Sequence, residues 1–487
     1  MNLEHLLGKK NVVVFFFVLA SFYIIGSSYV GLNGNQVWRQ SDSYSQILGF
    51  MGLKEIQPLT NFFGRVALYD MPIYQFLAAK IAVLTNTDPL VITKYLNLLL
   101  WFVLSYSGYL IAERFCKNAG TIFLSLITTS PLLLHYFSTP LPDVMALALS
   151  LAGIILLMTR SDWVGLVSGS ILLLVSALIK SPIPFVFIVF YCTSLLSNYK
   201  PAEHRLLYLK NLLPLSLAFI AAVSAEQIRK YTIGVDLSGF ANKPTWYFGT
   251  ASQRLSSDFW LMILHRLVYS FPFSKIGYIY VLMFVTYTVF SFRTSARDTL
   301  PFIVAFFAGW LIFSNLYFVH DYYELPVTIL FYLGTSFAFQ KTAEKITGLF
   351  PCSEEFNRIL LLLPSLIFLV MSPIEMIFMH NKISNFTTTS IYDSISYAMR
   401  HTGEFIYVND DRYRDHPDPS IGGLTKTRFM RISKDYLEKN CEQVLKDNSS
   451  ILVNGSSECL NAHKGDATTY IEDDGLQFYF KRGAGPD

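Results

Sequence analysis

The sequence predicts a polytopic α-helical membrane protein with about eleven transmembrane helices, followed by a small extracytoplasmic α/β domain. Hydrophobic residues make up 52% of the 487 residues, and only 15% of the residues are charged. A soluble domain is nearer a quarter charged, so this chain must bury much of its surface in lipid. Its mean hydropathy is +0.40, and its apolar residues gather in long runs.

Each predicted span is a run of mostly apolar residues that approaches the ~20 needed to cross a bilayer. The first run follows Lys9 and Lys10. It is longer than a typical signal-peptide core and has no clear cleavage site, so we expect it to remain uncleaved. The predicted spans are residues 11–31, 90–112, 119–137, 141–159, 163–179, 182–198, 211–228, 275–292, 299–318, 324–340 and 358–377.

Basic residues in the short loops predict the orientation of these spans. If Lys9 and Lys10 are cytoplasmic, every short inner loop carries at least one lysine or arginine, as the positive-inside rule requires. Within the outer segments, 71–84 is too short to span and 251–272 is amphipathic, so both are expected to lie along the membrane surface. The outer segments are then 32–89, 138–140, 180–181, 229–274, 319–323 and 378–487.

A change to polar composition near residue 380 divides the chain. Residues 1–379 form the membrane module, with outer loops 32–89 and 229–274, and residues 380–487 form the extracytoplasmic domain. Short strand-like runs and one helix predict an α/β domain there. These elements are expected at 404–408, 451–454 and 476–481 for the strands and at 436–445 for the helix.

The oxidation state of the two cysteines in residues 380–487 depends on the compartment in which this domain lies. The chain has 5 cysteines and no CxxC or other metal-ligand spacing. Cys441 and Cys459 form a disulfide if the tail lies in an oxidising compartment, or remain two free thiols.

Several separate outer loops bring acidic residues to one membrane face. Asp42 lies in the first outer loop, where a carboxylate can act as general base toward an acceptor hydroxyl or amine. Arg39 and Gln40 beside it can contact a phosphate or a sugar. Asp143 brings a second carboxylate to the start of a span. The alternatives are a solvated loop residue for Asp42 and a helix cap for Asp143.

Cationic and aromatic residues at the same face suit an anionic lipid headgroup. Lys180 ends an apolar run, and it either binds phosphate as a point charge or extends toward lipid headgroups. His320 can donate a hydrogen bond to a phosphate and opens the turn containing Tyr322 and Tyr323. The alternatives are a loop or capping residue for His320 and an aromatic belt for the tyrosines. Arg254 adds positive charge from the second long outer loop.

These residues resemble the GT-C superfamily, polytopic glycosyltransferases that use polyprenyl-phosphate sugars. The resemblance covers roughly residues 1–340 and is greatest toward the bacterial protein-mannosyltransferase-like and aminoarabinose-transferase-like branch. The matching segments are Trp38–Asp42 (WRQSD), Leu68–Phe76 (LYDMPIYQF), Pro142–Asp143 and His320–Pro326 (HDYYELP).

The resemblance implies transfer of one sugar from a polyprenyl-phosphate donor to an extracytoplasmic acceptor, which is lipopolysaccharide, another envelope glycan, a lipid or a protein. It implies that Asp42 is the general base, that Asp143 is a second catalytic acidic position, and that Lys180 and His320 contact the carrier phosphate. It further implies a bacterial inner membrane with the active site on the extracytoplasmic face. No cofactor is firmly implied and no metal ligand is assigned. Many relatives have paired acidic residues where this chain has the single Asp42, which leaves open the acceptor and any help from a divalent cation.

Other classes of function fit less well. The net charge of +3 and the lack of a basic tract argue against a nucleic-acid partner, and no GxGxxG or Walker motif indicates a nucleotide site. A transporter or flippase needs ionisable residues in mid-span, where this chain has few. A polymerase or ligase of lipid-linked glycans shares the many spans and outer Arg and His residues and stays open, as does a non-catalytic glycan-binding protein.

Overall fold

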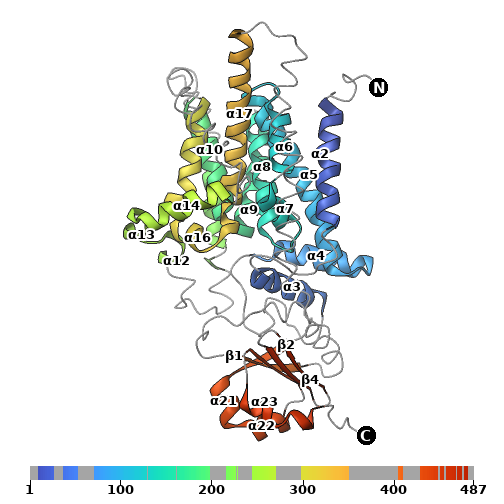
Figure 1. Cartoon of the computed structure of the whole chain (residues 1–487). Helices are drawn as coiled ribbons and strands as arrows, with labels where there is room; N and C mark the ends of the chain where they lie inside the picture. The colour runs from blue at the N-terminus through green and yellow to red at the C-terminus, as the bar shows by residue number, and fades with distance from the viewer. Residues whose placement is uncertain are drawn as a thin grey trace. The chain divides into compact units, whose positions relative to one another are not determined.

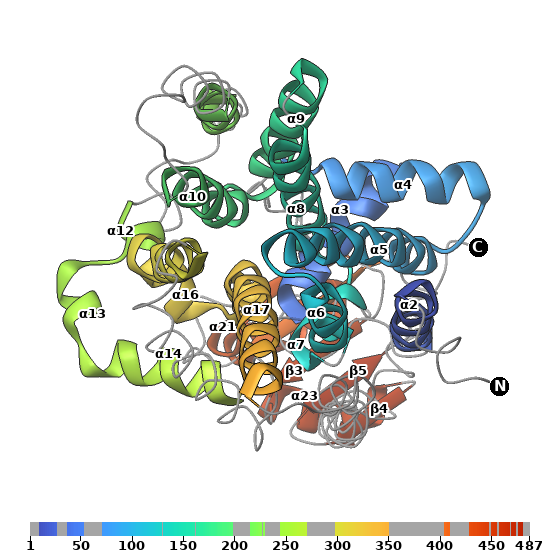
Figure 2. The same cartoon turned by 90° about the horizontal axis from the view of Figure 1, so that it is seen from above.

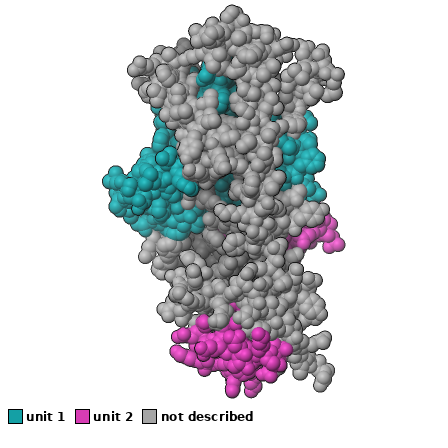
Figure 3. Space-filling view, viewed as in Figure 1, with its two compact units in different colours: residues 1–28, 94–378 teal, residues 29–93, 379–487 magenta. Residues whose placement is uncertain are grey.

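The computed structural model contains a bundle of helices and, toward the C-terminus, a β-sheet with short helices (Figures 1 and 2). The residues that the structure describes are 9–26, 37–52, 71–128, 130–160, 162–197, 215–225, 227–228, 244–269, 298–349, 404–409, 428–447, 450–454, 457–467, 469–473 and 476–480. The chain divides into two compact units, coloured separately in Figure 3: residues 1–28 with 94–378, and residues 29–93 with 379–487.

The described part of the first unit is helical. Helix α8 lies beside α9, and α6 lies beside α17, in both views (Figures 1 and 2). Helix α14 runs across the direction of α17, as expected for a helix along a membrane surface. The helices are α2 (Lys9–Gly26), α5 (Pro89–Phe115, whose first residues belong to the second unit), α6 (Ala119–Thr128), α7 (Pro131–Phe137), α8 (Asp143–Thr159), α9 (Trp163–Lys180), α10 (Pro182–Ser197), Leu215–Ala225, α12 (Pro244–Phe248), α13 (Ala251–Leu255), α14 (Ser257–Tyr269), Asp298–Ile312, α16 (Ser314–Val319), the short helix η3 (Asp321–Glu324) and α17 (Leu325–Leu349).

One side of α5 carries a stripe of large apolar residues. Val91, Tyr95, Leu99, Phe102 and Tyr106 are exposed and recur every three or four residues, which places them along one face of the helix. Single exposed apolar residues are ordinary on a soluble surface, but a continuous stripe indicates a face that contacts lipid or a partner. Within the described residues, α5 and α9 are long and apolar enough to cross a membrane, and seven shorter apolar helices accompany them.

Helices lie at the predicted spans that fall within the described residues. The predicted spans 275–292 and 358–377 lie outside those residues. The surface stretch 251–272, predicted as one segment, is divided into α13 and α14. The division is at Ser256, whose extended backbone ends the first of these helices.

Two predicted spans are each broken into two helices, which corrects the sequence analysis. Span 119–137 is broken before Pro131, which has no amide hydrogen and begins α7. Ser130 is the N-cap of α7, and its hydroxyl accepts a hydrogen bond from the helix backbone. Span 299–318 is interrupted by a bend at Phe313, before α16.

Small residues allow α8 and α9 to pack closely. A Cβ added to Gly153 would lie 2.9 Å from the carbonyl oxygen of Gly169, and the reverse distance is also 2.9 Å. The hydroxyl of Ser176 donates to the carbonyl of Ala146 at 2.7 Å and lies 2.8 Å from the hydroxyl of Ser150. Close backbone approach with interhelical hydroxyl bonds is typical of helix pairs in membranes. The paired residues run in opposite directions, so the two helices are antiparallel and the start of α8 is level with the end of α9.

The second unit has helices from the N-terminal part of the chain and a sheet-containing C-terminal segment. Its elements are α3 (Val37–Met51), α4 (Ile73–Thr85), β1 (Glu404–Asn409), β2 (Arg428–Ser433), α21 (Lys434–Lys439), α22 (Cys441–Asp447), β3 (Ser450–Asn454), α23 (Glu458–Ala462), η5 (Lys464–Asp466), β4 (Thr469–Asp473) and β5 (Leu476–Phe480).

Helix α4 lies where the sequence predicts a helix along the membrane surface. It packs against α3, and Phe76 meets Phe50 of α3 edge to face with ring centroids 5.6 Å apart. Its buried residues recur on one side, and the opposite side exposes apolar residues together with Lys80. The Lys80 ammonium lies 5.3 Å from the centre of the Phe76 ring. An exposed apolar face carrying a lysine is typical of an interfacial helix.

The C-terminal segment folds as a five-stranded mixed sheet in the order β2-β1-β3-β5-β4. Strands β2, β1 and β3 are parallel, and β5 is antiparallel to its neighbours β3 and β4. Ile451 and Tyr479 are register partners, and both enter a buried cluster with Leu437, Val444 and Leu460. This cluster joins one face of the sheet to α21, α22 and α23, which lie together on that side in Figure 1.

Strands β1, β3 and β5 lie at the three runs that the sequence predicts, and β2 and β4 complete the sheet. The helix predicted over 436–445 is instead two short helices, α21 and α22. The break is at Asn440, whose side-chain amide donates to the carbonyl of Tyr436 at 2.9 Å and whose backbone amide donates to the same carbonyl at 3.0 Å. The side chain of Asn440 thus supplies a local turn.

Cys441 of α22 is disulfide-bonded to Cys459 of α23, with Cα atoms 5.6 Å apart. Of the two alternatives left open by the sequence, the structure has the disulfide. The bond joins residues separated by 18 positions and encloses β3. Closing a loop of this size restricts the unfolded chain and stabilises the folded state by about 2–4 kcal/mol.

Removing the disulfide should therefore weaken the C-terminal segment. We expect the Cys441→Ser/Cys459→Ser variant of the full-length protein to lose about 2–4 kcal/mol of local unfolding free energy. Pulse proteolysis in detergent across a urea series measures this loss. A reductant should reproduce the effect in the wild type and have none in the variant. Equal protease resistance of the two proteins would show that the bond does not contribute.

Candidate functional site

Asp143 and Lys180 lie at the same end of the helix pair α8–α9. Asp143 is the first residue of α8, and Lys180 is the last residue of α9. Ser176 contacts Ala146. Asp143 precedes Ala146 by about 4.5 Å along α8, and Lys180 follows Ser176 by about 6 Å along α9, so the two residues lie at a similar level. Lys180 is only 3% exposed, so the alternative in which it extends to lipid headgroups is wrong. Asp143 is also buried, at the helix terminus where the dipole favours a negative charge.

The ammonium of Lys180 faces two tyrosine rings. Its Nζ lies 5.0 Å from the ring centre of Tyr323 and 5.8 Å from that of Tyr322. Both distances are within the ~6 Å range of cation–π attraction. Tyr322 is 2% exposed and Tyr323 is 6% exposed, so the alternative of a lipid-facing aromatic belt is wrong for both. Aromatic faces stabilise an ammonium through the ring quadrupole and leave its charge in place.

His320 lies between α16 and η3, where its ring contacts those of Tyr322, Trp246 and, at 6.0 Å, Tyr323. The imidazole stacks on Tyr322, with centroids 5.1 Å apart and an interplanar angle of 22°. It meets Trp246 of α12 edge to face at 5.9 Å. His320 is half-buried and makes no side-chain capping bond to η3. Because Tyr322 also faces Lys180, the structure brings Lys180 and the 320–323 turn together.

Helices α5 and α7 position the segment that leads into α8. The Nδ2 group of Asn97 donates to the buried carbonyl of Thr139 at 2.7 Å. The hydroxyl of Thr139 donates to the carbonyl of Tyr136 at 2.9 Å. The Tyr136 ring in turn meets Tyr322 edge to face at 6.4 Å. The residues preceding Asp143 are therefore fixed to the same aromatic cluster.

Arg254 of α13 binds backbone carbonyls at the end of a neighbouring helix. Its Nε donates to the carbonyl of Leu311 at 2.6 Å, and its Nη2 donates to the carbonyls of Phe248 and, at 3.4 Å, Ile312. Leu311 and Ile312 end the helix that begins at Asp298, where the helix dipole favours a cation. Arg254 therefore anchors α12 and α13 to that helix.

Arg39, Gln40 and Asp42 all lie in α3 of the second unit. Asp42 is 5% exposed, so the alternative of a solvated loop residue is wrong. Arg39 is on the same face of α3 as Asp42, whereas Gln40 is about 200° around the helix from it. Burial and, to a lesser degree, the charge of Asp88 raise the pKa of the Tyr44 phenol on α3, so this group remains neutral at physiological pH.

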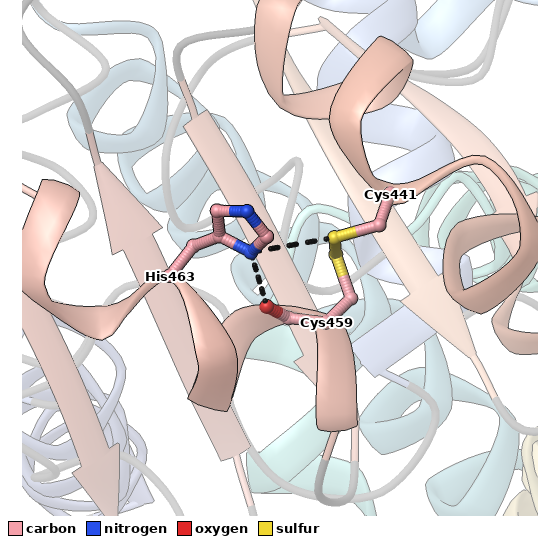
Figure 4. Close-up of side chains that lie close together, drawn as sticks. All are labelled: Cys441, Cys459 and His463. Atoms are coloured by element: carbon pink, nitrogen blue, oxygen red, sulfur yellow. Dashed lines mark hydrogen bonds between the residues drawn. A yellow bond between two sulfur atoms is a disulfide. The ribbon is translucent and has the colours of Figure 1, made fainter.

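Within the described part of the chain, one group of potential metal ligands occurs: Cys441, Cys459 and His463 (Figure 4). The cysteines are joined in the disulfide, which leaves no thiolate to bind a metal ion. The Nδ1 atom of His463 lies 3.0 Å from the carbonyl oxygen of Cys459 and 3.5 Å from the sulfur of Cys441. Neither atom carries a hydrogen, so Nδ1 is protonated and donates to them. With the disulfide formed and Nδ1 of His463 donating, these three residues stabilise the local fold.

Solved structures match the chain over nearly its whole length. It is 13% identical to ArnT from Cupriavidus metallidurans bound to undecaprenyl phosphate, with 99% of this chain and 100% of ArnT covered and a TM-score of 0.61. It is 12% identical to the oligosaccharyltransferase AglB from Archaeoglobus fulgidus in complex with an inhibitory peptide and a dolichol-phosphate, with coverage of 98% and 74% and a TM-score of 0.56. It is 10% identical to the arabinofuranosyltransferase AftD from Mycobacteria, with coverage of 97% and 40% and a TM-score of 0.56.

The fold is that of the GT-C glycosyltransferases. The resemblance stated from the sequence is thereby confirmed at the level of the fold. No protein-family model and no curated protein matches the chain. At such low identity the match carries the GT-C fold, and the roles of individual residues rest on the geometry described above.

Sequence analysis did not single out three residues that this geometry draws attention to: Tyr136, Trp246 and Lys94. Tyr136 joins the cluster through Tyr322, and Trp246 joins it through His320. The sequence features that mark these three residues are weak. They are aromatic residues in short segments beside the predicted outer face, and a lysine inside the apolar run of α5.

Lys94 is a buried cation near the start of α5. It is 7% exposed, and its Nζ has no hydrogen-bond partner among the described residues. It precedes Asn97 by three residues, so the two share a face of the helix, and Asn97 binds the segment that leads to Asp143. A buried cation without a partner is costly, particularly in a membrane protein, and marks a functional position. We therefore expect Lys94 to bind an anionic ligand.

Replacing Lys94 should lower ligand affinity without lowering thermal stability. In Lys94→Met, an uncompensated buried charge becomes an apolar side chain, so the melting temperature should stay the same or rise. Affinity for inorganic phosphate, used as an anionic probe, should fall by about 10-fold or more, since a hydrogen bond to a charged group is lost. Thermal melts and native mass spectrometry in detergent measure the two effects. The control is Lys80→Met, at an exposed lysine, which should change neither. A lower melting temperature with unchanged affinity would give Lys94 a structural role.

Proposed function

We propose that this protein is a membrane glycosyltransferase that moves one sugar from a polyprenyl-phosphate carrier to an extracytoplasmic acceptor. The observation that carries the proposal is the buried ammonium of Lys180, held over Tyr322 and Tyr323 beside His320, in a chain with the GT-C fold. A cationic and aromatic cluster of this kind suits the phosphate of a lipid carrier. ArnT, with the same fold, was solved bound to undecaprenyl phosphate.

The proposed reaction is a single displacement. Asp42 removes the proton of the acceptor hydroxyl while the acceptor oxygen attacks the anomeric carbon of the donor sugar. The bond from that carbon to the phosphate oxygen breaks, and the polyprenyl phosphate leaves with the bonding electrons. Lys180 and His320 stabilise the negative charge that develops on the phosphate. One displacement inverts the configuration at the anomeric carbon.

The remaining predicted residues have supporting roles in this proposal. Asp143, level with Lys180 at the end of the helix pair, is proposed to accept hydrogen bonds from hydroxyl groups of the donor sugar. Arg39 shares the face of Asp42 and is better placed than Gln40 to contact a substrate held there. Arg254 is proposed to act indirectly, by anchoring α12 and α13.

The proposed location is a bacterial inner membrane, with residues 380–487 as an extracytoplasmic domain. The disulfide between Cys441 and Cys459 supports this side, since disulfides form and persist in oxidising compartments. The exposed apolar stripe on α5 and the surface-type helix α4 support the membrane setting. The acceptor is proposed to be an envelope glycan, a lipid or a protein.

A second candidate is transfer of a preassembled glycan rather than one sugar. The observation that favours it is the fold match to the oligosaccharyltransferase AglB, at a TM-score of 0.56. The two candidates differ in the mass that is transferred. A lipid flippase is a weaker candidate, because the charged cluster lies at one end of the helix pair rather than along a path through it.

Mass spectrometry of envelope glycans tests the function directly. We compare the wild type, a deletion strain, and the deletion strain carrying an Asp42→Asn copy. One sugar should disappear in the deletion and remain missing with Asp42→Asn, since loss of a general base costs about 10²- to 10⁴-fold in rate. Asp258→Asn, at an exposed carboxylate of α14, is the control and should restore the sugar. Loss of a whole oligosaccharide would favour the second candidate, and full rescue by Asp42→Asn would contradict a role for this residue.

Lys180→Met tests the phosphate site independently of sugar and acceptor. Loss of a charged phosphate contact should weaken undecaprenyl phosphate binding by about 10- to 100-fold. Binding of undecaprenol, which has no phosphate, should be unaffected. The control is Lys341→Met, whose ammonium pairs with Glu344 at 2.9 Å on α17. Equal affinity of wild type and Lys180→Met for undecaprenyl phosphate would contradict the proposed site.

A further inference from the structure

We propose that Trp246 is a positioning residue, which fixes the imidazole of His320 in the orientation that binds the carrier phosphate. This inference rests on the proposed function, in which His320 contacts that phosphate. Trp246 belongs to α12, within outer loop 229–274, and meets the His320 ring edge to face at 5.9 Å.

The backbone that carries Trp246 is attached to α16 by several hydrogen bonds. The Nδ2 group of Asn315 donates to the carbonyl of Trp246 at 2.8 Å, and the hydroxyl of Ser314 donates to the carbonyl of Phe248 at 2.6 Å. The Nε2 group of Gln253 donates to the side-chain oxygen of Asn315 at 3.2 Å. The segment from α12 to α13 is therefore held onto α16, the helix that leads directly into His320.

The turn between α12 and α13 leaves no room for a side chain. Gly249 has a positive φ of 65°, which glycine adopts readily and other residues rarely do. A Cβ at this position would lie 2.5 Å from the hydroxyl oxygen of Ser314 and 2.1 Å from Oε1 of Gln253. Close approach of α12 to α16 therefore depends on a glycine here, and this approach brings the Trp246 ring to His320.

His320 needs neighbours to fix its orientation, because it is outside regular helix. Its backbone is extended, with φ −126° and ψ 127°, between the end of α16 and the start of η3. Tyr322 stacks on the imidazole at 5.1 Å and Tyr323 is tilted against it at 6.0 Å, both from the turn that follows His320. Trp246 comes from a different segment and meets the imidazole at an interplanar angle of 74°. A nearly perpendicular ring from another segment restricts rotation of the imidazole more than the two tyrosine rings of the turn do alone. Since a hydrogen bond to phosphate depends on direction, such restriction improves binding.

Phe248 provides a matched comparison on the same helix. Its ring stacks on Phe313 at 5.6 Å with an interplanar angle of 23°, so it packs α12 against the start of α16. Loss of the Phe248 ring should loosen α12 without removing the ring beside His320. A difference between substitutions at Trp246 and Phe248 therefore separates positioning of His320 from general packing.

A double-mutant cycle on the full-length protein in detergent tests the proposal. We measure the dissociation constant for undecaprenyl phosphate, and the melting temperature, in wild type, Trp246→Leu, His320→Ala and the double variant. Trp246→Leu should weaken binding by about 10-fold, and His320→Ala should weaken it at least as much. In the His320→Ala background, Trp246→Leu should have little further effect, because the residue on which it acts is gone. Trp246→Phe should restore most of the affinity, and Phe248→Leu should leave affinity near the wild-type value.

The outcomes distinguish failure of the positioning role of Trp246 from failure of the proposed function. If Trp246→Leu weakens binding by the same factor with and without His320, Trp246 acts independently and the positioning role is wrong. If Phe248→Leu weakens binding as much as Trp246→Leu, the effect is general packing and the positioning role is again wrong. If His320→Ala itself leaves affinity unchanged while Lys180→Met lowers it, the phosphate site stands but the role of His320 in it fails.

Discussion

The buried ammonium of Lys180 is the constraint on which the rest of this structure depends. A lysine inside a helical membrane protein is costly unless its charge is compensated. Here Tyr322 and Tyr323 place ring faces 5.8 Å and 5.0 Å from the ammonium. This contact ties the end of α9 to the turn before α17. The proposed function adds a second role for this ammonium, as a point charge that binds the carrier phosphate.

The helix pair α8–α9 and the α12–α16 contact set the positions of the groups around Lys180. Gly153 and Gly169 let the backbones of α8 and α9 approach closely, which sets Asp143 level with Lys180. Gly249 does the same for α12 and α16, which sets Trp246 beside His320. In both cases glycine determines where the side chains of the proposed site lie. A site on such rigid contacts keeps its geometry before substrate arrives, as electrostatic stabilisation requires.

The sequence predicted the helices well because apolar runs and positive loops report directly on a membrane environment. It also predicted that Lys180, His320 and the tyrosines have related roles, since topology alone brings the ends of neighbouring spans to one face. Hydropathy does not report the break before Pro131 within a continuous apolar run, because the residues on both sides are apolar. Trp246 was missed because its significance lies in a contact with a segment far away in the sequence. Lys94 was missed because its burial cannot be read from the sequence.

Asp42 belongs to one compact unit of the chain, and Lys180 and His320 belong to the other. Structure determination of the full-length protein with undecaprenyl phosphate tests the central claim most directly. We expect the phosphate within about 4 Å of the Lys180 ammonium, the usual limit of an ion pair. A phosphate bound elsewhere, with the Lys180 ammonium still over Tyr322 and Tyr323, would contradict it.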